Sequence, residues 1–197
     1  MAVVDFDDIP RAWRNQFRIE LETPRLRLRP FRVEDAAWLP DLLRDPEVCR
    51  FLWDFAETPE KARKTAEGMI RLDAMRHHFG YWAIQDKHTI EHHGWVELSK
   101  LEGWEGPSDE IAVSYVLRRA SWRRGIATEA AGRLMRHAFA AHALPRVMAM
   151  IMKGNLASRR VLEKLGMREK LTRTTDGGVE LVYFGIEAEE FAALCFQ

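Results

Sequence analysis

The chain has 197 residues, of which 47% are apolar and 30% charged, with a formal net charge of zero. This composition is typical of a globular domain and excludes disordered and collagen-like chains, while two cysteines are too few for a disulfide framework. No run of about 20 apolar residues could span a bilayer. The start of the chain is acidic (Asp5, Asp7 and Asp8) where a signal peptide would be basic, so we expect a cytoplasmic protein.

The first half of the chain predicts a strand, two helices and a meander of strands. Leu26 and Leu28 alternate with arginines, which is the period-2 pattern of a half-buried strand. Helical spacing follows over residues 34–44, and Thr58-Pro59-Glu60 opens a longer helix, because Pro is favoured in a first helical turn. Segments rich in β-branched and aromatic residues then predict three strands, over residues 79–85, 94–98 and 110–117.

The second half predicts a helix, a strand, a second helix and a hairpin. Helical spacing begins after Gly125 and ends near Ala141, and a proline separates it from a strand over residues 147–152. Asn155 caps the next helix, which a Leu-Gly pair ends. The last two strands, residues 167–173 and 179–187, flank a turn with two glycines, so we expect them to be antiparallel.

No repeat or Pro/Ser-rich linker divides these elements. We therefore expect one domain over residues 23–190, after an N-terminal extension over residues 1–22. That extension could pack against a second subunit, which leaves a homodimer open. The fold class is α/β (α+β), with a mixed central sheet of about six or seven strands flanked by about four helices.

The charges are distributed unevenly along the chain. Residues 118–173 carry fourteen Lys and Arg against three acids, a net charge of +11, which leaves −11 for the other residues. Such a segment attracts a polyanion, either a phosphorylated cofactor or a nucleic acid, although solvated helix faces produce the same pattern.

Within this basic segment, the loop between the strand at 110–117 and the next helix favours phosphate binding. A helix N-terminus offers unpaired N–H groups and a positive potential to an anion. Two arginines precede Gly125, which permits close approach, Ala127 is small, and Thr128 adds a hydroxyl. The Walker and Gly-x-Gly-x-x-Gly patterns are absent, so nucleotide hydrolysis and NAD binding are not favoured.

The segment Trp122-Arg123-Arg124-Gly125-Ile126-Ala127 resembles the acetyl-CoA loop of the GNAT acetyltransferase superfamily, Gln/Arg-x-x-Gly-x-Gly/Ala. Its tryptophan departs from the first position and, with the following Thr-Glu-Ala, resembles the RimJ/RimL-type branch, which acetylates protein N-termini and small amines. Residues 23–30 resemble the opening strand of that branch, and residues 155–167 resemble its Asn-x-x-Ser helix. The resemblance covers about residues 23–187.

The resemblance implies a twisted sheet with a V-shaped split between the strand ending near Leu117 and the strand beginning near Arg146, where the pantetheine arm would lie. It implies transfer of an acetyl group from acetyl-CoA to a primary amine, either a protein N-terminal α-amine or a small-molecule amine, by direct attack in a ternary complex. The implied cofactor-binding residues are Val116, Leu117, Arg123, Arg124, Gly125, Ile126, Ala127, Thr128, Asn155, Ser158 and Lys164, with Arg160 as an alternative to Lys164 at the adenosine phosphate.

Acyl transfer needs a polarised thioester carbonyl, a proton for the thiolate and a base for the amine. In the family a backbone N–H, here near Val116, binds the carbonyl, and a Tyr donates the proton; this chain has Leu162 at the Tyr position. Ser158 is the next candidate donor, although a serine there also makes ordinary helix-start hydrogen bonds. Glu110 is the candidate base, acting through water, and a solvated acid at a strand end is the equal alternative.

Trp53, Phe55, Trp95 and Glu97 lie in segments that flank the acceptor side of such a fold, so we expect them to bind the amine, although large aromatic residues also serve as core. Residues 88–92 read His-x-x-Glu-His, a zinc-protease motif that functions only on a helix. The short connection between two strands favours a polar hairpin and no metal. A CoA-binding pseudoenzyme, which Leu162 leaves open, and a basic nucleic-acid-binding module are the alternative functions.

Overall fold

The computed structural model describes residues 19–52, 56–75, 79–101 and 110–194. The chain forms two compact units. The N-terminal unit holds Met1–Trp95 and Val116–Trp122, and the C-terminal unit holds Val96–Tyr115 and Arg123–Gln197. Among the described residues, no helix is long and apolar enough to cross a membrane.

The expected mixed α/β fold is confirmed. The described strands form one eight-stranded sheet in the order β1-β2-β3-β4-β5-β6-β8-β7. Strands β5 (Ile111–Leu117) and β6 (Arg146–Met152) are parallel, and their described pairing is the single position Ala112 with Met148, near the start of each strand. Strand β6 instead pairs antiparallel with β8 (Glu180–Glu187) along its whole length. A sheet that splits between β5 and β6 has this pattern.

The structure has slightly more elements than the sequence predicts. The additional ones are short: strand β1 (Leu21–Glu22) and the helices α2 (Pro46–Cys49) and α6 (Ala188–Leu194). Strand β1 lies within the predicted N-terminal extension, where Leu21 pairs with Leu28 of β2 (Leu26–Pro30). Its two residues are too few for any periodic pattern to be read from sequence.

The N-terminal unit packs its helices on an aromatic core. Its elements are β1, β2, the 3₁₀ helix η3 (Val33–Ala37), α1 (Leu39–Leu43), α2, α3 (Pro59–Ala74), β3 (Gly80–Asp86) and parts of β4 (His92–Lys100) and β5. Helix α3 begins where predicted, because the Thr58 hydroxyl accepts the Lys61 N–H at 3.1 Å. Phe31 stacks on Tyr81 and meets Trp95 edge to face, so aromatic rings from β2's end, β3 and β4 form the centre of this core.

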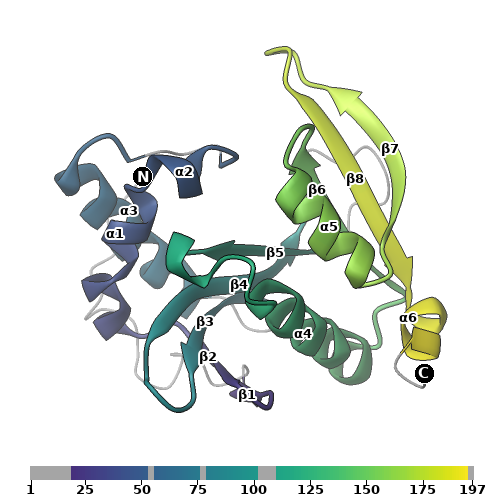
Figure 1. Ribbon diagram of the computed structural model, residues 1–197, viewed down its shortest axis with the longest axis horizontal. Coiled ribbons are helices and arrows are strands. Elements are labelled where there is room, and N and C mark those ends of the chain that lie inside the picture. Colours follow the sequence, from purple (N-terminus) through teal and green to yellow (C-terminus); the bar gives the residue numbers. More distant parts are fainter. Residues whose placement is uncertain (1–18, 53–55, 76–78, 102–109, 195–197) are drawn as a thin grey trace. The chain divides into compact units, whose positions relative to one another are not determined.

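The C-terminal unit supports two helices on β6 (Figure 1). Helix α4 (Ile126–His142) packs against α5 (Leu156–Lys164), and β7 (Arg168–Thr174) forms a long hairpin with β8. The helices approach closely at Gly132, where a Cβ atom would lie 3.2 Å from Leu165 Cδ2. Asn155 caps α5 as predicted, since its Oδ1 accepts the Ser158 N–H at 3.1 Å.

Candidate functional site

The predicted phosphate loop has a backbone shape that few residues adopt. Gly125 is the N-cap of α4 and has a left-handed backbone, with φ of 77°. Arg123 is also left-handed, with φ of 60°, which is uncommon for a residue with a side chain. Gly125 is needed here because it adopts this conformation without steric cost. The loop between Trp122 and α4 therefore contains two residues with a left-handed backbone conformation.

This loop exposes the start of a 17-residue helix. Arg123, Arg124 and Gly125 are exposed, and no side chain caps the helix at Gly125. The first N–H groups of any α-helix have no partner within the helix. In α4 the Glu129 N–H donates to the Gly125 carbonyl at 3.0 Å and so makes the first bond of the regular helical pattern. Uncapped amides at the positive end of a helix, preceded by two guanidinium groups, fit a diphosphate.

The residues behind the loop are apolar and small. Ile126 and Ala127 are buried, and Thr128 is half-buried. Buried apolar side chains hold the first turn of α4 in place. The loop therefore combines exposed positive charge with an uncapped helix start, the two features that a phosphate-binding site needs.

Trp122 stands where the acetyl-CoA loop motif has Gln or Arg, and its side chain binds the last residue of β5. Its indole N–H donates to the Leu117 carbonyl at 2.8 Å, and its side chain keeps 41% exposure. Val116 and Leu117 themselves are buried. Sequence reasoning noted the tryptophan as a departure and missed this bond, because a contact five residues away within an irregular turn leaves no periodic signal.

Ser158 is fixed through its backbone. Its N–H donates to the Asn155 cap, and its carbonyl accepts the Tyr115 hydroxyl at 3.2 Å. Burial raises the pKa of Tyr115, so this phenol stays protonated as a donor. Both bonds use backbone atoms of Ser158, so neither requires its hydroxyl. The contact of Tyr115 with the candidate residue Ser158 was not predicted from the sequence.

Lys164, predicted at the adenosine phosphate, is exposed in the last turn of α5, and Arg160, the alternative, is exposed on the same helix. Cations in this position also interact favourably with the negative end of the helix. The prediction that either binds the cofactor stays a prediction.

Glu110, the candidate base, is 7% exposed and ion-paired. Arg146, the first residue of β6, donates its Nε–H to Glu110 Oε1 at 2.6 Å. This hydrogen bond raises the pKa of Arg146 further above its usual value. Glu110 is therefore not a solvated acid at a strand end, the alternative that its sequence position left open.

The predicted acceptor residues lie in different environments. Trp95 is 5% exposed and belongs to the core of the N-terminal unit, which is the alternative that we noted for large aromatic residues. Glu97 is half-buried and accepts the Ser114 hydroxyl at 3.0 Å. Trp53 and Phe55 lie outside the described residues. Their role in acceptor binding stays a prediction.

The His-x-x-Glu-His segment forms a turn between β3 and β4, as its polar hairpin pattern predicts. Asp86 holds the turn by accepting the N–H groups of Thr89 and His88, and these bonds lower the pKa of Asp86 to about 2. Ile90 has φ of 63°, which no helix contains. No group of three or more metal-ligating side chains is found in the described parts of the chain.

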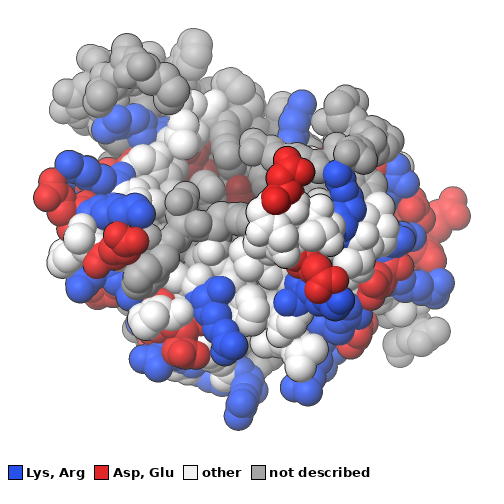
Figure 2. Space-filling model, turned by 90° about the horizontal axis from the view of Figure 1, so that it is seen from above, with Lys and Arg blue, Asp and Glu red and all other residues white. Residues whose placement is uncertain are grey.

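Several basic residues of the segment 118–173 pair with acids. Within the N-terminal unit, Arg118 pairs with Glu91 and Arg119 with Asp45. The C-terminal unit pairs Arg146 with Glu110, Lys153 with Glu180, Arg159 with Glu169 and Arg168 with Glu190. On the face drawn in Figure 2, Lys and Arg are interspersed with Asp and Glu. The charge polarity along the sequence therefore does not appear as one basic patch on this face.

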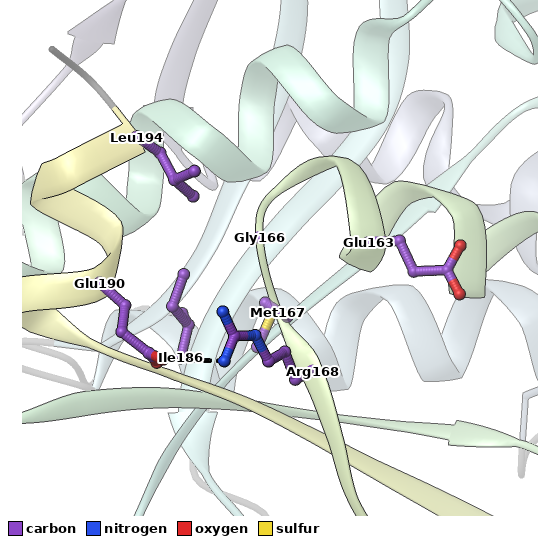
Figure 3. A pocket seen from close by; sticks show the side chains of 7 residues that line it. All are labelled: Glu163, Gly166, Met167, Arg168, Ile186, Glu190 and Leu194. Carbon is purple, nitrogen blue, oxygen red and sulfur yellow. Dashed lines mark ion pairs between the residues drawn. The ribbon is translucent and has the colours of Figure 1, made fainter. Parts of the chain in front are cut away.

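A pocket of about 310 Å³ lies at the far end of α5, away from its Asn155 cap (Figure 3). Apolar side chains and an Arg168–Glu190 ion pair at 3.5 Å line it. Gly166 has a left-handed backbone with φ of 79°, which favours glycine at this place. None of the residues lining this pocket is a predicted site residue, and the uncapped start of α4 is the stronger candidate site.

Comparison with known proteins shows to which family the chain belongs. Residues 25–168 match the acetyltransferase (GNAT) domain family. The chain belongs to the GNAT acetyltransferase family. The family transfers acetyl groups from acetyl-CoA. A relative named uncharacterized protein YkkB, from Bacillus subtilis, is 30% identical over 79% of this chain and 88% of its own length.

Two further proteins illustrate the similarity of this GNAT domain to others. An uncharacterized N-acetyltransferase p20 of Bacillus licheniformis is 27% identical over 76% of this chain and 83% of its own length. A crystal structure of a GNAT-family acetyltransferase from Bacillus anthracis superimposes with a TM-score of 0.74 at 20% identity, and covers 87% of this chain and 99% of the other. That likeness establishes the shared fold.

Proposed function

We propose that this GNAT domain, over residues 23–190, transfers the acetyl group of acetyl-CoA to a primary amine in the cytoplasm. The observation that carries the proposal is the exposed, uncapped start of α4, with Gly125 at φ of 77° and two arginines before it. Family membership supports acetyl-CoA as the donor. Interspersed acids and the paired arginines make a nucleic-acid module the weaker alternative.

In this proposal the diphosphate binds to the backbone N–H groups and side chains of residues 123–128. Exposed guanidinium groups supply charge, and the helix start supplies oriented donors. The backbone of Val116 and Leu117 would pair with the pantetheine arm in the manner of an added strand. Asn155 would serve the pantetheine or acetyl end, and Lys164 the adenosine phosphate.

Bound acetyl-CoA supplies the thioester that a neutral amine attacks directly in a ternary complex. A C–N bond forms as the C–S bond breaks, the amine loses a proton and the thiolate gains one. We assign the donated proton to the Ser158 hydroxyl, whose residue is positioned by its backbone bonds to Asn155 and Tyr115. We assign acceptance of the amine proton to Glu110 through water, with Arg146 stabilising the carboxylate.

The acceptor that we propose is an α-amine of a protein N-terminus or a small-molecule amine, as in the RimJ/RimL-type branch. Support comes from the opening segment Thr23–Pro30, the Trp122 variant of the loop and the Asn-x-x-Ser start of α5. An α-amine has a pKa near 8, so about a tenth of it is neutral at pH 7, and a weak base is sufficient. A lysine side chain would cost about 3 kcal/mol more to deprotonate.

Thiol release from acetyl-CoA, measured over N-terminal peptides, polyamines, amino acids and aminoglycosides, tests the proposal. Acetyl-CoA at 100 times its Kd should also raise the free energy of unfolding by about 2.7 kcal/mol. Stabilisation without thiol release for any acceptor would favour a pseudoenzyme. No stabilisation by acetyl-CoA, together with steeply salt-dependent binding of DNA or RNA, would favour the nucleic-acid module.

A further inference from the structure

A buried serine and histidine lie directly before the phosphate loop. Ser121 ends the 3₁₀ turn η4 (Arg119–Ser121), and His93 is the second residue of β4. Ser121 Oγ and His93 Nδ1 lie 2.8 Å apart, and the two residues are 1% and 0% exposed. Because burial removes both groups from water, this contact replaces the hydrogen bonds that water would make.

The other nitrogen of the His93 ring faces a carboxylate. His93 Nε2 lies 3.6 Å from Asp86 Oδ2, within electrostatic reach and longer than a hydrogen bond. Asp86 stays ionised above about pH 2, because the Thr89 and His88 N–H groups lower its pKa to about 2. A fixed negative charge beside Nε2 favours the tautomer with its proton there. Nδ1 then accepts from the Ser121 hydroxyl.

The backbone of His93 also binds the turn that holds Ser121. Its carbonyl accepts the Arg118 N–H at 2.9 Å, where the chain leaves β5. The next residue, Gly94, has no room for a side chain, since a Cβ atom would lie 2.0 Å from the Val116 carbonyl oxygen. Strand β4 therefore binds the turn over residues 118–121 at both ends. The His93 carbonyl binds Arg118 at its start, and the His93 ring contacts Ser121 at its end.

These bonds do not form a nucleophilic site. The order Asp86, His93, Ser121 matches an acid, base and serine relay, but the Ser121 hydroxyl is buried and cannot reach a substrate. Its effect is on the chain that follows. Only Trp122 separates Ser121 from Arg123, the first left-handed residue of the loop.

We infer that Asp86, His93 and Ser121 are positioning residues for the diphosphate of acetyl-CoA, an inference that rests on the proposed function. The buried Ser121–His93 contact fixes the chain at the residue before Trp122, and the loop that carries the donors continues directly from this fixed point. Oriented donors bind an anion better than donors that must first be ordered. Loss of the contact lowers the affinity for the diphosphate half of the cofactor.

Binding of CoA and of S-acetylpantetheine, which lacks the diphosphate, separates this role from a general structural one. Ser121→Ala removes the hydroxyl and is expected to weaken CoA binding about fivefold, the value of one hydrogen bond, while S-acetylpantetheine binding stays within about twofold. Asp86→Asn keeps a side-chain oxygen for the Thr89 and His88 N–H groups and removes the charge, and it should weaken CoA binding in the same selective way. Ser99→Ala, on the same strand as His93, is the matched control and should change neither affinity.

Isothermal titration at one pH, with the unfolding free energy of each variant measured in urea, provides the readout. Selective loss of CoA affinity in Ser121→Ala with a folded chain supports the inference. Unchanged CoA affinity, or an equal loss for both ligands, overturns it. Wild-type protein with no detectable affinity for either CoA or S-acetylpantetheine would instead overturn the proposed function.

Discussion

Glu110 and Arg146 join the starts of two neighbouring strands through a hydrogen bond of 2.6 Å between Glu110 Oε1 and Arg146 Nε. The acid is buried, and the arginine is 36% exposed and also lies 3.8 Å from Glu187. A buried acid with one strong partner can hold the strands together, accept a proton in catalysis, or both. Matched substitutions distinguish these roles.

Glu110→Gln and Arg146→Gln each remove this ion pair and should each lower the free energy of unfolding by about 1–3 kcal/mol. If Glu110 is the base, kcat falls about 100-fold or more in Glu110→Gln alone, the usual size of a general-base contribution. Urea unfolding and steady-state kinetics on the best acceptor measure both effects. A kcat of Glu110→Gln equal to that of the wild type would leave Glu110 with a structural role only.

Ser158→Ala should lower kcat about 100-fold while the free energy of unfolding changes by less than about 0.5 kcal/mol. The two described bonds of Ser158 use its backbone N–H and carbonyl, which alanine retains. Tyr115→Phe is the control, because it keeps the Ser158 hydroxyl and removes a bond to the carbonyl. It should cost about 1 kcal/mol of stability. Full activity of Ser158→Ala would remove the serine as proton donor.

Gly125→Ala should weaken acetyl-CoA binding and destabilise the fold by about 1 kcal/mol, because its φ of 77° is unfavourable for a residue with a Cβ atom. Gly68, inside α3, is the matched control. An added Cβ there meets nothing within 4 Å, so Gly68→Ala should stabilise the fold by about 0.5–1 kcal/mol. Thermal unfolding with and without acetyl-CoA checks both, and an unaffected ligand shift in Gly125→Ala would contradict the proposed loop.

Arg124→Ala should raise the KM for acetyl-CoA about tenfold or more, since hydrogen bonds to a charged group contribute about 1.5–3 kcal/mol. Arg136→Ala, which removes an exposed arginine farther along α4, should leave this KM unchanged. The KM for the amine acceptor should not change in either variant. Identical donor KM values for the two variants would show that bulk charge, and not the loop, attracts the cofactor.

The stability of the N-terminal unit should fall as the pH drops from about 6.5, in part because of His92. Burial and the nearby Arg29 guanidinium lower the pKa of His92 below its ordinary value of 6.5. The unfolded chain therefore gains a proton at a higher pH than the folded chain does, and acid favours unfolding. Arg29 lies 2.9 Å from the His92 ring, Asp35 lies 3.8 Å away, and His93 and Arg118 add further repulsion.

His92→Gln removes this titration and retains an acceptor for Arg29. The difference in urea midpoint between pH 7.5 and pH 5.5 should be smaller in this variant than in the wild type. Asp35 responds only at lower pH: burial raises its pKa, but bonds from Arg29, the Arg32 N–H and Trp38 outweigh burial and leave the pKa below its ordinary value. An unchanged pH difference in His92→Gln would show that other groups cause the acid sensitivity.

Local signals predicted the long helices well. Thr58 and Asn155 cap α3 and α5 where expected, and Gly125 starts α4, because each signal acts within three or four residues of chain. The turn at Gly125 was readable for the same reason. Short α2, β1 and α6 lack the length for a periodic pattern and depend on tertiary contacts.

Pairings between distant residues could not be read. Glu110 meets Arg146 over 36 positions, and His93 meets Ser121 over 28, so their partners follow from sheet topology and not from local spacing. The sequence likewise does not show which arginines of residues 118–173 have acidic partners: Arg118 and Arg119 pair with acids that lie elsewhere in the chain. Trp95 lies in the core because β4 directs it there.

Strand β7 is last in the strand order, so one of its sides has no neighbouring strand in the described sheet. A row of unsatisfied backbone donors and acceptors on such a side attracts strands from other molecules. Consecutive charges at Arg168, Glu169 and Lys170, all exposed, oppose this addition through desolvation cost. The hairpin can therefore project into solvent without starting aggregation, and replacing these charges with valines would be expected to make the protein precipitate.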